Sequence, residues 1–354
     1  MLEIRGMILP YWAILFTASC WANLVGLIIS SGLNSVVTIY ILVPIILVPE
    51  LLFSGVVVDF DKMHNKITSF KHVPLIGEIM TSRWAYEAIM VTQFKDNKFE
   101  KAFYSSEKKL KSAIYYRSYS IPEIKSLAYQ SQNLINKSDT TKLWGKLEII
   151  RKEVSEIGNE LGWRTDQLER ELTVKQYNDS VLARLENFLS TSERKFINIY
   201  NSAIAEKDKK YQELSQKLGG NEKFMDFKQK YYNKQLAFVI ANEKELSEFV
   251  IQNNEIVRVR DAVYRTPEFN NGRAHFYAPV KKVFGLHIGT LYFNLLFIWL
   301  FSAVLFVILY YDILRKIIAY FESLLIIRRT RRRLLRLLLV EQQNVKQTLQ
   351  GLKG

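Results

Sequence analysis

The chain of 354 residues is poor in cysteine and, over long stretches, in charge. Its single cysteine, Cys20, excludes any disulfide bond within the chain. From Gly6 to Pro49 there is no Asp, Glu, Lys, Arg or His. Because a helix crosses the hydrocarbon core of a bilayer with about 20 apolar residues, this stretch is long enough for two crossings. It is several times longer than the apolar part of a signal peptide, which makes that alternative a poor explanation.

We therefore predict a transmembrane hairpin over residues 1–58, with spans at about 7–29 and 36–58 and a small polar turn between them. A second charge-poor run, residues 283–311, contains only His287 among the five charged residue types and predicts a third span, with His287 as an anchor at its outer mouth. Residues 59–282 between the spans are hydrophilic, with 38 Lys and Arg against 30 Asp and Glu. The sequence thus predicts an all-α membrane protein with three spans and a large insertion between the last two.

Basic residues gather after the third span, and they predict its orientation. Arg315 and Lys316 follow it closely, and the tail 312–354 also contains Arg328, Arg329, Arg331, Arg332, Arg333 and Arg336. By the positive-inside rule the C-terminus is cytoplasmic, so the N-terminus and residues 59–282 lie outside a plasma or bacterial inner membrane. Leucines alternate with these arginines, which favours a helix on anionic lipid. A partner-binding helix and a nucleic-acid patch are the alternatives, and we expect no nucleic-acid partner.

The insertion divides into two predicted parts. Residues 59–100 include a segment too apolar for a free loop and too polar to span, so we expect interfacial or re-entrant external helices with Trp84 and Tyr86 at the level of the lipid headgroups. Residues 101–282 show helical periodicity in three tracts, at about 143–172, 177–218 and 222–252, with a possible short strand at 256–260. In the first tract the apolar seam is Leu143, Leu147, Ile150, Val154, Ile157 and Leu161. These tracts predict an extracytoplasmic helical bundle or an antiparallel coiled-coil arm; docking of a partner is the alternative use of the same faces.

No constellation of catalytic residues is apparent. The sequence has no G-x-x-x-x-G-K-[ST] phosphate-binding loop and no G-x-S-x-G motif, and its four histidines have no metal-binding spacing. We expect no enzymatic activity and no metal site or cofactor in this chain.

Glu50 is the one acidic residue within the second predicted span. Counted back from Asp59 at about 1.5 Å per residue, it lies roughly 13 Å below the outer boundary, near mid-membrane. A carboxylate there usually faces a cavity or a polar partner, although a neutralised structural glutamate is the alternative. Pro44 and Pro49 should bend the helix around it. Asn294 in the third span is a weaker signal of the same kind, able to hydrogen-bond across a helix interface.

Two short motifs carry a resemblance to a known family. The run Leu52-Phe53-Ser54-Gly55-Val56-Val57-Val58 is followed by Ser82-Arg83-Trp84-Ala85-Tyr86-Glu87-Ala88 and then by Gln93-Phe94. In order and membrane context these resemble the end of the fifth transmembrane helix and the next external segment of G-subfamily (White/pigment type) ABC transporters, whose permease is of the ABC-2 type. The resemblance covers about residues 7–94 and 283–316.

The resemblance implies that the three spans correspond to helices 4–6 of such a permease. It places Phe53, Ser54 and Gly55 near the outer gate of the translocation path, where the argument from charge also puts Glu50. It places Arg83, Trp84, Tyr86 and Glu87 on re-entrant external helices. It also implies a dimer of permease halves driven by ATP and Mg²⁺ on a nucleotide-binding domain, here expected on a missing segment or a partner chain. The long insertion is outside the family pattern. The alternative hypothesis is a membrane-tethered scaffold that presents an external coiled-coil arm.

Overall fold

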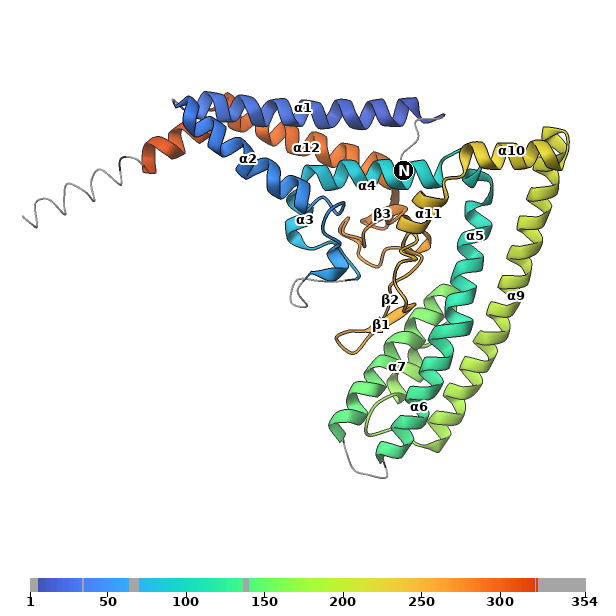
Figure 1. Cartoon of the computed structure of the whole chain (residues 1–354). Coiled ribbons are helices and arrows are strands. Elements are labelled where there is room, and N and C mark those ends of the chain that lie inside the picture. Colours follow the sequence, from blue (N-terminus) through green and yellow to red (C-terminus); the bar gives the residue numbers. More distant parts are fainter. Residues whose placement is uncertain (1–5, 34, 64–69, 136–139, 322, 324–354) are drawn as a thin grey trace, which may run out of the picture. The chain divides into compact units, whose positions relative to one another are not determined.

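A computed structural model of the chain describes residues 6–33, 35–63, 70–135, 140–321 and 323 (Figure 1). These residues are mostly helical and divide into two compact units, each with its own contacts. Unit 1 consists of residues 1–15 and 50–296, and unit 2 of residues 16–49 and 297–354. The basic tail residues Arg328, Arg329, Arg331, Arg332, Arg333 and Arg336 lie outside the described part of the chain.

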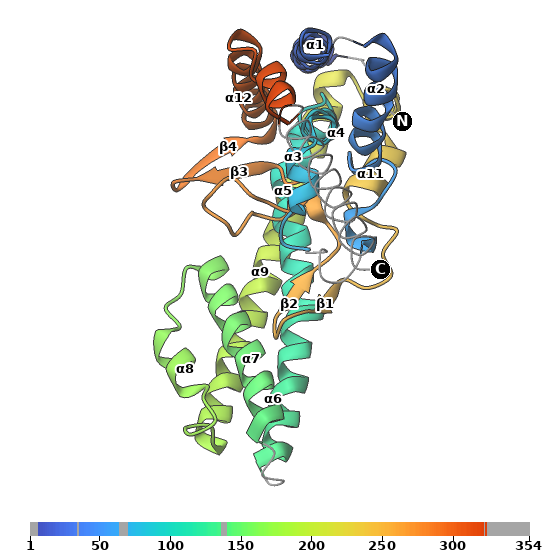
Figure 2. The ribbon, with the colours of Figure 1, turned by 90° about the vertical axis from the view of Figure 1, so that its left-hand side faces the viewer.

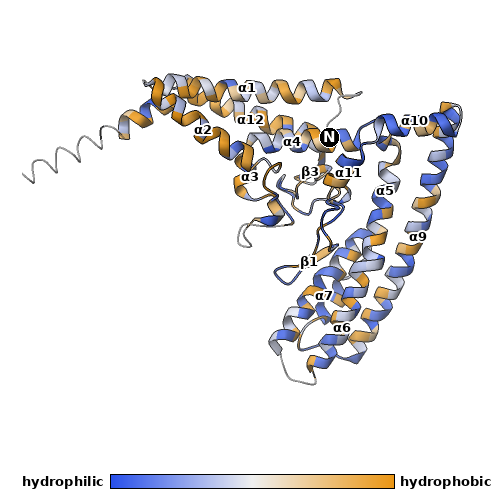
Figure 3. Cartoon of the chain, viewed as in Figure 1, coloured by the Kyte–Doolittle hydropathy of each residue, from blue (hydrophilic) through white to orange (hydrophobic). Residues whose placement is uncertain are grey.

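Three apolar helices supply most of the described residues of unit 2, and Figure 3 shows their ribbons coloured mostly as hydrophobic. Helices α1 (Ile8–Gly32) and α12 (Thr290–Tyr310) are long and apolar enough to cross a membrane, with 25 and 21 residues. Helix α2 (Val36–Leu52) has 17 residues, or about 26 Å at 1.5 Å per residue, which is a little short of a hydrocarbon core of about 30 Å. Two of the three expected spans are therefore confirmed as long apolar helices, and the three-span topology remains a prediction.

The second predicted span was drawn too long, because α2 ends at Leu52 and not at residue 58. The Ser54 hydroxyl turns back to donate a hydrogen bond to the carbonyl of Leu51 at 2.8 Å, and it accepts one from the amide of Val56 at 3.2 Å. Gly55 then adopts a left-handed conformation with φ of 81°. A side chain that competes for the helix hydrogen bonds, followed by a residue with positive φ, is sufficient to end the helix.

The third predicted span begins too early, because residues 280–289 form a hairpin of β3 (Val280–Val283) and β4 (Leu286–Gly289). The turn residues Phe284 and Gly285 have φ of 48° and 83°, as a two-residue turn of the primed type requires. Helix α12 starts only after this hairpin. His287 is therefore an exposed residue of β4 and not part of the helix, and its role as an interfacial anchor remains a prediction.

A helical bundle forms the largest part of unit 1 (Figure 2). Its helices are α5 (Glu100–Tyr115), α6 (Ile121–Ile135), α7 (Thr140–Leu161), the short α8 (Asp166–Glu171) and the 40-residue α9 (Asp179–Leu218), which runs along α5. The predicted seam of α7 lies in its core, and the second predicted tract matches α9. Asn178 caps the start of α9 by accepting from the amide of Val181, and left-handed Gly219 ends it. A helical bundle is present, but two of its helices, α5 and α6, were not among the predicted tracts. Its extracytoplasmic location and a coiled-coil arm remain predictions.

One π-helical turn, Tyr116–Ser120, joins α5 to α6. The amide of Ile121 reaches back five residues to the carbonyl of Tyr116. Pro122 follows and has no amide hydrogen, so a regular α-helical ladder could not continue unbroken at this point. The extra residue in this turn points Ser120 into the bundle, where its side chain is fully buried.

The third amphipathic tract, predicted at 222–252, is not one helix. It forms α10 (Asn221–Tyr231) and α11 (Lys234–Ile240), separated by Tyr232 in an extended conformation and by Asn233, which caps α11. Beyond α11 come a hairpin of β1 (Phe249–Ile251) and β2 (Ile256–Arg258), which confirms the short strand, and a 3₁₀ turn at Ala262–Tyr264. The fold is therefore mostly α with two small hairpins, and residues 243–289 are largely not helical.

Candidate functional site

The candidate site lies where the end of α2 meets α4 (Thr81–Lys95), the helix that carries the Arg83–Ala88 motif. The carboxylate of Glu50 accepts hydrogen bonds from the first amides of α4, with Oε1 at 3.3 Å from the nitrogen of Thr81 and Oε2 at 3.0 Å from that of Ser82. The Ser82 hydroxyl lies 2.6 Å from Glu50 Oε2 and 2.5 Å from the Glu50 carbonyl oxygen. Glu50 therefore caps α4 with a negative charge at the positive end of its dipole.

This geometry corrects the expected position of Glu50 along its helix. Because α2 ends at Leu52, Glu50 is two residues, or about 3 Å, from the end of the helix and not near its middle, and its depth in a membrane remains a prediction. Of the roles that the sequence left open, the structure shows pairing with a polar partner, the N-terminus of α4. A place for Glu50 on a translocation path remains a prediction.

The Phe53–Gly55 segment forms the turn that follows Glu50. Ser54 is buried and makes the helix-ending hydrogen bonds described above. A Cβ on Gly55 would approach the ring of Phe276 to 2.5 Å, so this position requires glycine for space as well as for its positive φ. The turn is thus packed against Phe60, which follows it closely, and against Phe276, which is far from it in the sequence.

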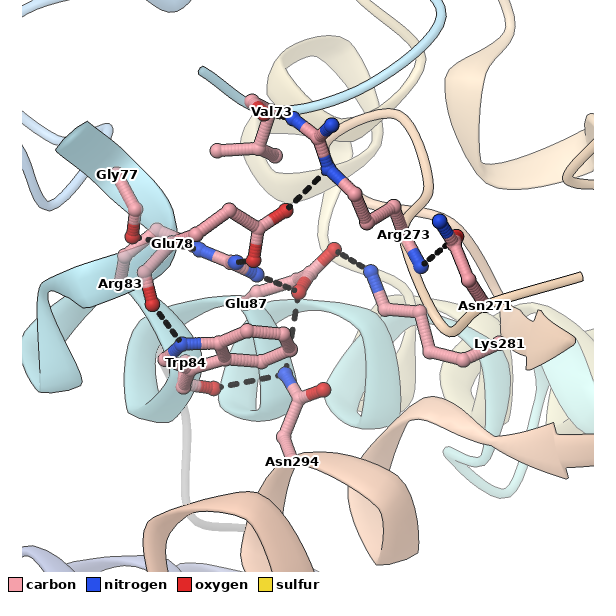
Figure 4. A network of polar contacts seen from close by, with 10 residues as sticks. All are labelled: Val73, Gly77, Glu78, Arg83, Trp84, Glu87, Asn271, Arg273, Lys281 and Asn294. Carbon is pink, nitrogen blue, oxygen red and sulfur yellow. Dashed lines mark hydrogen bonds and ion pairs between the residues drawn. The ribbon is translucent and has the colours of Figure 1, made fainter. Parts of the chain in front are cut away.

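Arg83 lies at the centre of a buried network of polar contacts (Figure 4). Its side chain is 0% exposed, and its Nη1 donates to Glu87 Oε2 at 2.9 Å, one helical turn further along α4. Nη2 donates to Glu78 of the short helix α3 (Leu75–Ile79), and Nε donates to the carbonyl of Gly77 at 3.2 Å. The guanidinium also stacks on Trp84, 3.5 Å from its ring centroid.

Trp84 is not the interfacial anchor expected from the sequence. Only 2% of its surface is exposed, and its indole nitrogen donates to the carbonyl of Glu78 at 2.8 Å. A tryptophan that covers a buried arginine cannot also reach the headgroups. Tyr86, on the same helix, is partly buried against Phe276 and Tyr277.

Glu87 joins α4 to two distant parts of the chain. Its Oε1 accepts from Lys281 of β3 at 2.7 Å, and its Oε2 accepts from the side-chain amide of Asn294 in α12 at 3.1 Å. Asn294 also donates to the carbonyl of Trp84 at 2.9 Å, which confirms the expected hydrogen bond across a helix interface. We call Glu78, Arg83, Glu87, Lys281 and Asn294 the Glu87 cluster.

The charges of the Glu87 cluster balance. Burial acts to raise the pKa of Glu87, but the charges of Lys281 and Arg83 outweigh it and hold this pKa below its ordinary value. Glu87 is therefore ionised at neutral pH. Two buried cations and two carboxylates within hydrogen-bonding distance make a rigid joint, because removal of any one of them leaves another charge unpaired.

The described residues contain one group of acids that could hold a metal ion, Glu156, Glu255 and Glu268, whose oxygens lie within 4.8 Å of one another. Lys71 already donates to Glu255 and, at 2.8 Å, to Glu268, so an ammonium group occupies part of this position. The group therefore has its own cation within the protein.

Part of this site could have been found in the sequence and part could not. Arg83 and Glu87 are four residues apart on a helix, which is the spacing of an intrahelical ion pair. Their other partners, Lys281 and Asn294, are about 200 residues away, and Lys281 sits in a hydrophilic stretch where nothing marks it as buried. The capping of α4 by Glu50 depends likewise on contact between segments that the sequence does not connect.

Comparison with known proteins gives one result that bears on this site. No curated protein and no solved structure matches the chain. Residues 2–94 match the family model described as ABC-2 type transporter. The matched region contains α1, α2, Glu50 and most of α4, and together with the long apolar helices it suggests a membrane protein that is the membrane component of a transporter. ABC-2 permease domains normally pair with ATPase subunits.

Proposed function

We propose that this chain is part of the permease of an ABC-2 exporter of the G (White/pigment) type. The observation that carries the proposal is the ABC-2 match over residues 2–94, which ends just where the capped helix α4 ends. The ATPase that drives it, with ATP and Mg²⁺, belongs to another segment or to a partner chain, and this chain has no catalytic activity of its own. Two permease halves form a dimer in which the α2 helices face the path.

The same proposal fixes an orientation. The N-terminus and residues 59–282 are outside, and the C-terminus is cytoplasmic, where its arginines contact anionic lipid. The Glu50 cap and the Glu87 cluster are then mechanical links. A displacement at the end of α2 acts on the N-terminus of α4 through Glu50, and α4 is tied through Glu87 to Lys281 and Asn294. The path, in this scheme, opens beside the Phe53–Gly55 turn.

The partner assignment is tested by purification from native membranes in a mild detergent. We expect a polypeptide with a phosphate-binding loop to co-purify and to hydrolyse ATP. A clean preparation without any ATPase contradicts the proposal and favours the tethered scaffold.

The role of Glu50 separates the two functions further. Glu50→Gln and Glu50→Leu should change the ATPase rate or the efflux of the assembled transporter, whereas a scaffold would keep its partner binding unaltered. Arg194→Gln, at an exposed position of α9, serves as the matched control and should change neither.

The orientation can be tested because Cys20 is the only cysteine. In a Cys20→Ser background, Glu222→Cys and Ser323→Cys each introduce one exposed thiol. A maleimide that cannot cross membranes should label the first in intact cells and the second only after the cells are opened. The reverse pattern contradicts the proposed orientation.

A further inference from the structure

Unit 1 contains a cavity of about 480 Å³ next to the turn that ends α2. This volume is in the range of sites for small organic molecules, about 300–1,000 Å³. The wall combines the Gly55 turn, α4 and α11 with the loop around residues 259–277. The residues that matter most below are Phe60, Val239, Arg265, His275 and Phe276.

Most of this wall is aromatic or aliphatic. Phe60 and Phe276 meet edge to face with centroids 5.1 Å apart, and Tyr86 packs against Tyr277 in the same way at 6.3 Å. The Phe60–Phe276 pair is held in place by the Gly55 backbone, which leaves no room for a Cβ. Aromatic faces and edges fixed in this way suit a flat, apolar ring system.

The polar groups of the wall are largely neutral or paired. Asp59 and Lys244 form an ion pair at 2.6 Å, so their charges cancel. The Nε2 of His275 lies 2.8 Å from the carbonyl oxygen of Ala262 and must carry the proton, since a carbonyl can only accept. Burial lowers the pKa of His275 well below its ordinary value, and burial together with Arg273 lowers that of His72, so both rings are uncharged at neutral pH.

Arg265 is the exception. It lies in the wall and is mostly buried, yet its guanidinium makes no hydrogen bond or ion pair with any residue that the structure describes. The charges of Glu268 and Glu156 act on it without a hydrogen bond or ion pair, and Glu268 is already bonded to Lys71. Burial lowers the pKa of Arg265, but an arginine remains protonated in proteins. Arg265 is therefore a buried cation of the wall whose guanidinium donors have no hydrogen-bonding partner among the described residues.

We propose that this cavity binds an aromatic monoanion, a flat apolar ring system with a single carboxylate or sulfonate that pairs with Arg265. The aromatic wall supplies the surface for the rings, and the lone guanidinium supplies a charge-assisted, two-pronged contact for the acid. A cationic ligand is disfavoured because Asp59 is already paired, and a dianion would bring one charge too many. The proposal does not depend on the transport function.

The test uses the full chain in lipid nanodiscs, with 2-naphthoate as the anionic probe and 2-naphthalenemethanol as the uncharged probe of the same ring system. Isothermal titration calorimetry, with empty nanodiscs as the blank, measures both affinities. The wild-type chain should bind 2-naphthoate at least tenfold more tightly than the alcohol. Arg265→Gln should weaken 2-naphthoate about tenfold and leave the alcohol unchanged, whereas Arg265→Lys should retain most of the difference.

Two further variants make the test specific. Val239→Phe fills the cavity and should abolish the binding of both probes, while Arg194→Gln on the bundle surface should affect neither. The proposal is overturned if neither probe binds above the blank, if the two bind equally, or if Val239→Phe leaves 2-naphthoate binding intact. A loss of both probes in Arg265→Gln with an unchanged far-ultraviolet circular dichroism spectrum also overturns the role of the charge.

Discussion

Unit 1 holds two groups of charged side chains. Their carboxylates ionise differently because the two groups have different numbers of cations. In the Glu87 cluster, Arg83 and Lys281 match Glu78 and Glu87 one for one. The second group, which we call the Lys71 cluster, consists of Lys71 with Glu153, Glu156, Glu255 and Glu268, and Lys152 reaches Glu255 only at 3.9 Å. Glu87 is ionised in the first group, although burial raises the pKa of Glu78, and the second group has too few cations for all of its acids to ionise.

The pKa values follow this difference. Burial and then the charge of Glu268 raise the pKa of Glu156 to about 7. Glu153 is fully buried, and burial raises its pKa well above the ordinary value. One of its oxygens accepts from Ser120 at 2.8 Å, while the other has no partner among the described residues. Glu87 and Glu153 are both fully buried, so between these two acids it is the supply of nearby cations that determines which one ionises.

The largest effect is expected when the balance of the Glu87 cluster is broken. Lys281→Met leaves the buried carboxylate of Glu87 with one cation fewer, and the loss of one partner of a buried ion pair costs about 3–5 kcal/mol. The midpoint of thermal unfolding in detergent should fall accordingly. The double variant Glu87→Gln with Lys281→Met should recover much of the loss. If Lys281→Met alone unfolds at the wild-type temperature, the cluster does not hold the fold together.

The Lys71 cluster should make the protein less stable as the pH rises, whereas an ordinary ion pair of a carboxylate makes it more stable. The folded-state pKa of Glu156, about 7, lies above its ordinary value of 4.5. Below about pH 4.5 Glu156 is protonated in both the folded and the unfolded chain. As the pH rises from about 4.5 to 7, the unfolded chain releases this proton first, so the free energy of unfolding falls by about 3 kcal/mol at most. Glu156→Gln should remove this loss. It should be more stable than wild type at pH 8 and equally stable near pH 4.5.

Unfolding curves of both proteins at several pH values measure this effect. Glu222→Gln, at an exposed position of α10, is the control and should follow the wild type throughout. A Glu156→Gln variant that is less stable than wild type at pH 8 would show that Glu156 is ionised and paired in the folded state.

A smaller effect is expected at Glu50, where the counter-charge is a helix terminus and not a cation. Glu50→Gln keeps one acceptor but loses the charge, and loss of such a cap costs about 1 kcal/mol. Hydrogen exchange of the Thr81 and Ser82 amides should become faster, with no change in the middle of α9. Unchanged exchange at both amides would mean that Glu50 does not bind them.

The smallest effect should come from an exposed ion pair, which is the reference for the others. Lys125 of α6 and Glu193 of α9 are 2.7 Å apart, with about a third of each side chain exposed. Lys125→Ala should lower the free energy of unfolding by about 0.2–1 kcal/mol, and less in high salt. A loss comparable with that of Lys281→Met would remove the distinction between buried and exposed charges in this protein.

Much of the helical structure could be predicted because it depends on local periodicity. The seam from Leu143 to Leu161 and the pair Gly219–Gly220 indicate the length of α7 and the end of α9 without any knowledge of their neighbours. The ends of the apolar helices were not predicted correctly, because hydropathy within a segment does not show where that segment stops being helical. Leu52 and Thr290 mark boundaries made by a serine hydroxyl and by a hairpin turn, which hydropathy does not detect.

The candidate site was only half predictable. Arg83, Trp84, Tyr86 and Glu87 were singled out by the family resemblance, yet the sequence indicated a surface position where the structure shows burial. The burial depends on Lys281 and Asn294, whose contacts with Glu87 close loops of about 200 residues. No periodicity links residues so far apart.

The two prolines of α2 have a consequence beyond the shape of that helix. Because proline has no amide hydrogen, Pro44 and Pro49 cannot satisfy the carbonyl oxygens of Tyr40 and Ile45, four residues before each of them. In hydrocarbon an unsatisfied carbonyl is costly, so each oxygen needs a donor such as a hydroxyl group, a neighbouring helix or water. An apolar helix thereby gains two hydrogen-bond acceptors that can attract polar molecules. Both are backbone carbonyl groups, so substitution of the side chains of Tyr40 or Ile45 would not remove them.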